Sequence, residues 1–356
     1  MTDHSHLKLG KRARRHDPRT LQLARYLTAA GQAQAGQALP GQAQPIQPPA
    51  SVDYTCGIRD WGMMLNDQLG CCTIAAVGHA VQTWTANASQ ELTVPDSTIL
   101  EYYEKWDGYN PANPSTDQGG VELDVLNDWR QQGFGGVSLD AYAEIGLSGV
   151  RSPMSEVTQA IWVFGGAYIG VELPIRAQTQ DVWDVPANLG PDDEPGSWGG
   201  HAIYLVGYDM RDSGPGTRDS GLGSSDSASR IPNSGTQTAD SGSSVSVSGF
   251  RIPDSGASVS DSETQTSKIE SRIAGSESRV ASPQSPAPSA QPPTLTCITW
   301  GKPKKMTFAW FEKYCSEAYA LVSKDWLKLS GVAPSGFDLA TLESDLEEVS
   351  GVRCQE

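Results

Sequence analysis

The sequence has little positive charge. Its 356 residues include 42 acidic and 26 basic side chains, giving a formal net charge of −16 at pH 7. An acidic excess of this size repels phosphate groups and anionic lipids, so we expect no nucleic-acid or membrane partner. The basic residues that are present gather near the N-terminus, at Lys8, Lys11, Arg12, Arg14, Arg15, Arg19 and Arg25. This cluster favours a solvated tail, with contact to an acidic partner as the alternative.

Long apolar runs are also absent, and so is a basic and then apolar secretion signal. The sequence therefore predicts a cytoplasmic protein, with phage association or non-classical export as alternatives. We also expect a monomer. Six cysteines are too few for a disulfide scaffold, and they lack the paired spacing of metal ligands. We expect free thiols, no metal and no other cofactor.

Histidine is scarce, with five residues in the chain, three of them within the first 16 positions. Cysteine–histidine chemistry elsewhere must therefore use His79 or His201. His79 lies two turns after Cys72 in an apolar helical stretch, which favours a structural role for its side chain.

Two segments have too few apolar residues to form a core. Residues 1–50 are basic and then rich in Gln, Ala, Gly and Pro, and residues 211–293 are dominated by Ser, Gly, Asp, Thr and Pro. We predict a disordered tail and a disordered insertion in a surface loop. Residues 51–210 and 294–356 are left to form one folded domain.

Helical patterns come first in that domain and strand patterns later, which predicts an α+β fold. The expected helical lobe spans about 51–165, and the sheet lobe spans about 166–210 plus 294–325. Helices are predicted at 73–84, 97–106, 122–132, 155–163, from about 307, and at about 338–349. Strands are predicted at 167–173, 201–208, 296–300 and 318–322, with a turn at 302–305.

Cys72 is the candidate nucleophile. It follows a polar turn at residues 66–70 and opens the apolar helix, with Cys71 as its neighbour. A helix N-terminus has unpaired N–H groups and partial positive charge, which shifts a thiol toward the reactive thiolate.

Residues 66–76 resemble the active-site segment of papain-like cysteine peptidases, in which an amide side chain lies six residues before the cysteine. Residues 199–208 resemble the histidine strand of that family, and residues 117–120 its Gly-Gly loop. The motifs at 65–72, 198–201 and 298–302 look like a divergent branch found in bacteria and their phages.

The resemblance implies a papain-like fold, in which a buried central helix packs against an antiparallel sheet lobe and the active-site cleft lies between the lobes. It implies that Cys72 attacks a peptide or related amide bond, that His201 acts as base and then acid, and that Asn66 stabilises the oxyanion. Gly119, Gly120 and Gly200 are the implied substrate-binding residues. The partner is then a peptide or protein substrate, and the acyl acceptor, water or an amine, stays open.

One motif departs from the family. Residues 298–301 read Ile-Thr-Trp-Gly, so Ile298 stands where an Asn orients the histidine in the family. Trp300 can still shield the site, but the hydrogen bond to the imidazole must come from Thr299, from a backbone carbonyl or from no group. The alternative function is a catalytically weak or inactive papain-like module that binds a peptide or protein partner.

Overall fold

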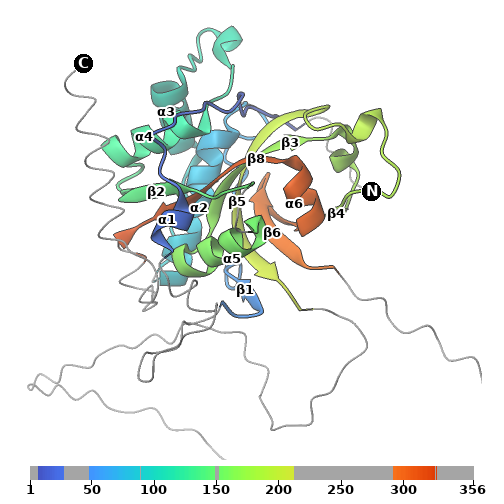
Figure 1. The fold of residues 1–356 in the computed structure, drawn as a ribbon. Helices are drawn as coiled ribbons and strands as arrows, with labels where there is room; N and C mark the ends of the chain where they lie inside the picture. Colours follow the sequence, from blue (N-terminus) through green and yellow to red (C-terminus); the bar gives the residue numbers. More distant parts are fainter. Residues whose placement is uncertain are drawn as a thin grey trace, which may run out of the picture. The chain divides into compact units, whose positions relative to one another are not determined.

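The computed structural model describes residues 7–27, 48–88, 90–148, 152–211, 292–324 and 326 (Figure 1). Nearly all of the predicted insertion, the predicted helix at 338–349 and residues 28–47 of the predicted tail lie outside the described residues. None of the helices among the described residues is long and apolar enough to cross a membrane.

The helices follow the sequence patterns closely. The central one, α2 (Cys72–Ala88), has every side chain from Cys72 to Trp84 buried, which explains its nearly unbroken run of apolar and small residues. α3 (Asp96–Asp107) ends at Gly108, which adopts the left-handed conformation common after a helix. The remaining α-helices and 3₁₀ turns are α1 (Leu23–Tyr26), α4 (Glu122–Gln132), α5 (Pro153–Phe164), α6 (Phe308–Tyr314), η2 (Pro114–Thr116), η3 (Ile175–Gln178) and η4 (Pro191–Asp193).

The strands form one eight-stranded sheet, in the order β2-β8-β3-β5-β6-β7-β4, with β1 paired to β5. All neighbouring pairs are antiparallel except β4 and β7. The fold class is therefore a mixed α+β domain. The strands are β1 (Ser51–Asp53), β2 (Ala141–Glu144), β3 (Ala167–Leu173), β4 (Val182–Trp183), β5 (Gly199–Asp209), β6 (Thr294–Thr299), β7 (Lys302–Thr307) and β8 (Cys315–Val322).

The predicted turn at residues 302–305 is wrong, because this stretch lies within β7. The chain reverses two residues earlier, where Trp300 and Gly301 both have positive φ angles, of 45° and 68°. Two such residues make the tight turn that matches strand twist. Thr299 and Lys302 consequently face each other across the hairpin, and β7 pairs with β6 along its whole length.

The N-terminal stretch also differs from the expectation of a disordered tail. Residues 7–27 pack against the domain, with Leu23 and Tyr26 fully buried and Lys11 only 6% exposed. Gln22 forms a parallel bridge with Glu144 of β2, at the edge of the sheet. The packing depends on a few buried side chains and on backbone pairing. The average composition of residues 1–50 does not indicate either of them.

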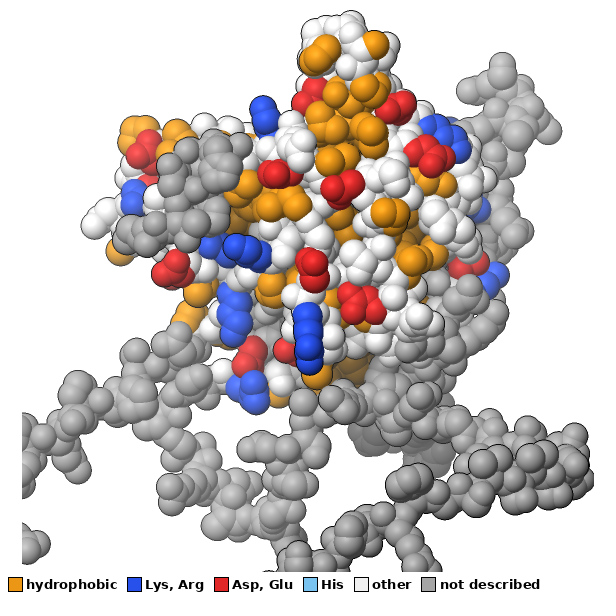
Figure 2. All heavy atoms as spheres, turned by 180° about the vertical axis from the view of Figure 1, so that it is seen from behind, with side chains coloured by type: hydrophobic (Ala, Val, Ile, Leu, Met, Phe, Trp, Pro, Cys, Tyr) orange, Lys and Arg blue, Asp and Glu red, His pale blue; other side chains and the backbone are white. Residues whose placement is uncertain are grey.

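The predicted insertion leaves and rejoins the sheet at one place. Asp209 at the end of β5 pairs with Thr294 at the start of β6, so the two strand ends lie side by side. On the face of the molecule shown in Figure 2, acidic, basic and apolar side chains are interspersed.

Candidate active site around Cys72

A tight turn delivers Cys72 to the first residue of α2. Met64 and Leu65 in this turn have positive φ angles of 53° and 61°, a conformation that costs energy for residues other than glycine. The Asp117 carboxylate stabilises the turn by accepting hydrogen bonds from the Gly70 N–H at 2.9 Å and the Tyr103 hydroxyl at 2.6 Å. The turn is thus fastened to the loop at 117–120.

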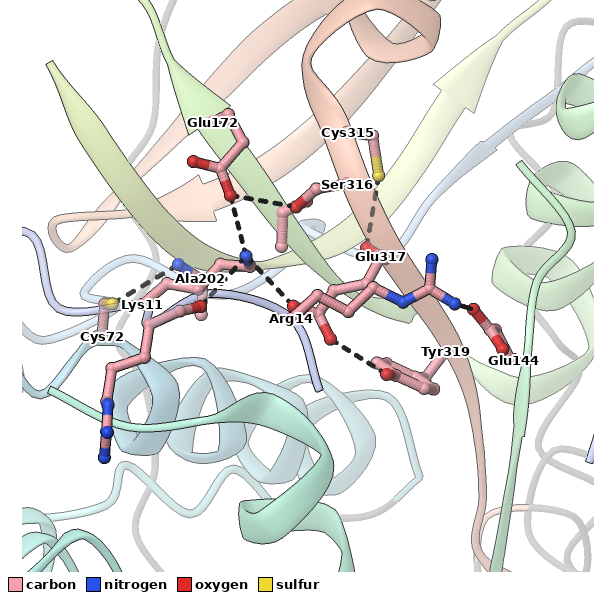
Figure 3. A network of polar contacts seen from close by, with 12 residues as sticks. Lys11, Arg14, Cys72, Glu144, Glu172, Ala202, Cys315, Ser316, Glu317 and Tyr319 are labelled. Carbon is pink, nitrogen blue, oxygen red and sulfur yellow. Dashed lines mark hydrogen bonds and ion pairs between the residues drawn. The ribbon is translucent and has the colours of Figure 1, made fainter. Parts of the chain in front are cut away.

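The Cys72 thiol is fully buried, and its sulfur accepts a hydrogen bond from the Ala202 N–H of β5 at 3.4 Å (Figure 3). Desolvation raises the pKa of the thiol to about 12, although backbone hydrogen bonds from Ala202 and Gly10 oppose this shift. Cys72 is therefore a protonated thiol in this state and not the expected thiolate. The loss of hydration raises its pKa more than the partial positive charge of the helix N-terminus lowers it. Cys71 is also buried, and its thiol faces the Met64 carbonyl at 3.4 Å.

His201 precedes Ala202 in β5, and it is the Ala202 N–H that contacts the Cys72 sulfur. Its Nε2 is 2.8 Å from the Thr299 hydroxyl oxygen, and its ring stacks on Trp300 with centroids 4.3 Å apart. Nδ1 is buried and has no hydrogen-bond partner among the described residues. Burial, and secondarily the charge of His79, lowers the pKa of His201 to about 3, so the imidazole is neutral.

The hydrogen bond to this imidazole is made by the Thr299 hydroxyl, one of the two possible partners that the sequence offered. Ile298, which the resemblance to papain-like peptidases aligned with an Asn, is fully buried in β6. His79 lies inside α2, where its Nε2 is 3.4 Å from the Gly62 carbonyl oxygen.

Asn66 is 2% exposed and points into its own turn. Its Nδ2 donates to the Leu69 carbonyl at 3.3 Å. This contact uses one of the two amide hydrogens, and the other remains to serve an oxyanion. The role of Asn66 in oxyanion binding stays a prediction.

The three predicted substrate-binding glycines contact a peptide, namely residues 7–15 of the chain itself, here called the N-terminal segment. Gly120 donates to the Gly10 carbonyl and accepts from the Arg12 N–H, both at 2.8 Å, and the Lys11 N–H donates to the Gly200 carbonyl at 3.1 Å. Gly119 leaves no room for a side chain, since a Cβ there would lie 1.8 Å from the Gly10 carbonyl oxygen. The N-terminal segment is therefore held as an extended strand over Cys72.

Further contacts fix both ends of the N-terminal segment. Trp300 donates from its indole N–H to the Lys8 carbonyl at 3.2 Å. Arg14 pairs with Glu144, and Arg15 pairs with Asp124. The basic cluster thus neutralises carboxylates of its own domain. A cavity of about 350 Å³ adjoins this site, with Leu7, Thr299 and Trp300 among its lining residues.

Sequence reasoning missed the Lys11 side chain and the carboxylates around it. Lys11 ion-pairs with Glu172 and Glu317, and Glu122 acts on it electrostatically. These glutamates come from α4, β3 and β8, so no local spacing could have revealed them. No group of three or more His, Cys, Asp or Glu residues suited to a metal ion was found in the described part of the chain.

No protein-family model matches the chain, and no curated protein matches it. Among solved structures, the chain is similar to xylellain, a cysteine protease from Xylella fastidiosa. The TM-score is 0.39 and the identity 16%, over 59% of this chain and 82% of that chain. A likeness at this level leaves the function to be inferred from the chain's own residues.

Proposed function

We propose that this chain is a papain-like thiol hydrolase that cleaves peptide or related amide bonds, and that its N-terminal segment keeps it latent by occupying the site. The observation that carries the proposal is the extended peptide held over Cys72. Its backbone pairs with Gly120 and Gly200 in the way that a bound substrate requires.

The proposed reaction begins when Cys72 Sγ attacks the carbonyl carbon and its proton passes to His201. The reaction requires the tautomer that carries its hydrogen on Nε2, which the Thr299 hydroxyl can accept, and that leaves a lone pair on Nδ1 for the thiol proton. The carbonyl oxygen becomes an oxyanion that receives hydrogen bonds from Asn66 and the Cys72 N–H. The C–N bond then breaks, the amine takes the proton from His201, and water releases the acyl group from sulfur.

Latency follows from the protonation states in the occupied site. With the N-terminal segment in place, burial keeps the thiol protonated and the imidazole neutral. When the segment leaves, water enters, the pKa of Cys72 falls and that of His201 rises. Both changes favour the thiolate–imidazolium pair that performs the attack.

A labelling experiment tests the proposal. Gly10→Val opens the site, because a Cβ at Gly10 would lie 1.7 Å from the Gly70 carbonyl oxygen. This variant is treated with iodoacetamide and with an epoxide at pH 7, modified thiols are mapped by mass spectrometry, and the exposed Cys56 serves as internal reference. A fluorogenic peptide pool reports cleavage in parallel.

We expect Cys72 to react faster than Cys56, and we expect His201→Ala to abolish both this advantage and peptide cleavage. The alternative function, a module that binds a peptide without cleaving it, predicts an uncleaved pool and a Cys72 that reacts no faster than Cys56. That result would exclude the hydrolase.

A further inference from the structure

An acidic pocket lies next to the candidate thiol and is filled by one lysine side chain. The Lys11 side chain is fully buried, with Nζ 3.0 Å from Glu172 Oε1 and 3.0 Å from Glu317 Oε1 (Figure 3). Nζ also donates to the Arg12 carbonyl at 3.3 Å. The ammonium therefore donates hydrogen bonds to Glu172 and to the Arg12 carbonyl and forms an ion pair with Glu317, whose Oε1 accepts no hydrogen bond among the described residues.

The folded domain, not the N-terminal segment, builds this acidic pocket. Glu122 is the first residue of α4, Glu172 lies in β3 and Glu317 lies in β8. Tyr319 orients Glu317 by donating to its Oε2 at 2.9 Å, and Ser316 contacts Glu172 Oε1 at 3.3 Å.

Gly170 provides the space for the lysine stem. A Cβ at this position would lie 2.1 Å from Lys11 Cε and 2.8 Å from Glu122 Oε1. The stem therefore fills the room that a side chain at residue 170 would take.

The charge of the acidic pocket calls for a cation. Glu122 and Glu317 are both fully buried, and neither oxygen of Glu122 has a hydrogen-bond partner among the described residues. Desolvation and the neighbouring Glu317 raise the pKa of Glu122, whereas the charge of Lys11 lowers it. A buried carboxylate cluster of this kind is costly without a positive charge inside it.

The acidic pocket receives the side chain of one defined position in a bound peptide, the position that Lys11 occupies here. The Gly10 backbone lies close enough to the Cys72 thiol to lower its pKa, and Lys11 is the next residue. Gly120 holds the peptide groups on both sides of Lys11. A peptide bound to Gly120 and Gly200 in the same way directs the side chain of its corresponding residue into the carboxylates.

We propose that the acidic pocket formed by Glu122, Glu172 and Glu317 is a specificity pocket that selects peptides with a lysine side chain at the position now taken by Lys11. The selective cleavage of such peptides rests on the proposed function, whereas their selective binding does not. Lys11 is then the chain's own stand-in for the substrate lysine, and the two compete for the same carboxylates.

A binding experiment tests the acidic pocket independently of catalysis. The full chain carrying Lys11→Ala and Cys72→Ser is titrated with a fluorescent synthetic peptide of residues 7–15, and with the same peptide carrying norleucine in place of Lys11. We expect the lysine peptide to bind at least about thirtyfold more tightly, because norleucine keeps the stem but loses the buried charged hydrogen bonds.

Variants that neutralise single carboxylates show which glutamates produce the preference for the lysine peptide. Glu317→Gln is expected to reduce the ratio of affinities to below about fivefold, and Glu122→Gln provides a second variant should Glu317→Gln melt early. Glu144→Gln is the matched control, since Glu144 contacts Arg14 and not Lys11. This control should weaken both peptides equally and leave their ratio unchanged.

A cleavage experiment separates this inference from the proposed function. Two fluorogenic peptide pools, with lysine or norleucine at the same position, are presented to the Lys11→Ala chain with Cys72 intact. Lysine-dependent binding without cleavage would reject the hydrolase and leave the acidic pocket as a lysine-binding site. Equal binding of the two peptides, or cleavage of both pools at equal kcat/KM, would overturn the specificity pocket.

Discussion

Replacing Lys11 with methionine should convert the latent chain into a reactive one. The substitution keeps an unbranched side chain of similar length and removes the ammonium group. In the occupied state it leaves Glu122 and Glu317 fully buried with no cation between them. These carboxylates can then become hydrated only if the N-terminal segment leaves the site.

The magnitude follows from the two short ion contacts. At 3.0 Å and an effective dielectric constant of about 20, each contact contributes roughly 5 kcal/mol of Coulomb attraction, most of which is offset by desolvation. Removing one partner of a buried pair costs about 3–5 kcal/mol, because the other charge is left unpaired. Docking of the N-terminal segment should weaken by a factor of roughly 10² to 5 × 10³.

The assay is the rate of Cys72 alkylation by iodoacetamide at pH 7, measured by mass spectrometry. Because the buried thiol reacts only in the open state, the rate should rise by about the same factor until the open state predominates. Lys8→Met is the matched control. It removes the same charge from the same segment, but the Lys8 side chain is exposed, so its rate should stay within about threefold of the wild type.

The melting temperature distinguishes opening from unfolding. We expect a cooperative transition close to that of the wild type, because the carboxylates become hydrated once the N-terminal segment has left. If Lys11→Met and Lys8→Met alkylate at equal rates and both fold, the buried ion contacts do not hold the segment in place. The account of latency given above would then be wrong.

Three further predictions concern other parts of the molecule. In the Lys11→Met background, Thr299→Val should lower kcat by about 10- to 100-fold with little change in KM, whereas Thr299→Ser should restore it, since only the hydroxyl orients His201. Burial lowers the pKa of His79 to about 4, so the unfolded chain binds a proton near pH 6.5 before the folded chain does. Relative to His79→Gln, the wild type should lose up to about 3 kcal/mol of unfolding free energy between pH 6.5 and pH 4, measured by urea titration. Replacing residues 212–291 with a short Asn-Gly turn should not lower the melting temperature, because Asp209 and Thr294 already pair and a tenfold shorter loop saves about 2 kcal/mol of closure entropy; a large fall would show that the domain depends on the replaced residues.

The elements that sequence reasoning predicted are those with continuous local patterns. The stretch from Cys72 to Trp84 is buried on all sides and therefore apolar throughout, which predicts α2 directly. β5 has the same kind of local signature around His201. In contrast, β7 was misread as a turn because the true turn places Trp300, a bulky residue, at a φ angle of 45°, which nothing in its residue type suggests.

Sequence reasoning named Cys72, His201 and Thr299 as site residues but did not predict the state of the site. The Ala202 N–H contacts the Cys72 sulfur and the Thr299 hydroxyl contacts the His201 imidazole. The composition of residues 1–50 gave no sign that Gly10 and Lys11 would pack against these elements. The N-terminal segment binds by backbone pairing and buried charge rather than by buried apolar area. A hydropathy pattern therefore cannot predict its binding. The acidic pocket was missed because β3 and β8 become neighbours only in the folded sheet.

The N-terminal segment and the site that it covers belong to one covalent chain, and this decides how the proposed latency responds to concentration. A tethered ligand is present at a fixed local concentration, on the order of millimolar for a short flexible connection, however dilute the protein becomes. Dilution therefore cannot release it, and the resting fraction is the same at every protein level. Two kinds of event can change that fraction in the unaltered chain: a cut in the tether, which turns an intramolecular equilibrium into one that dilution can shift, or a competitor that brings its own cation to Glu122, Glu172 and Glu317.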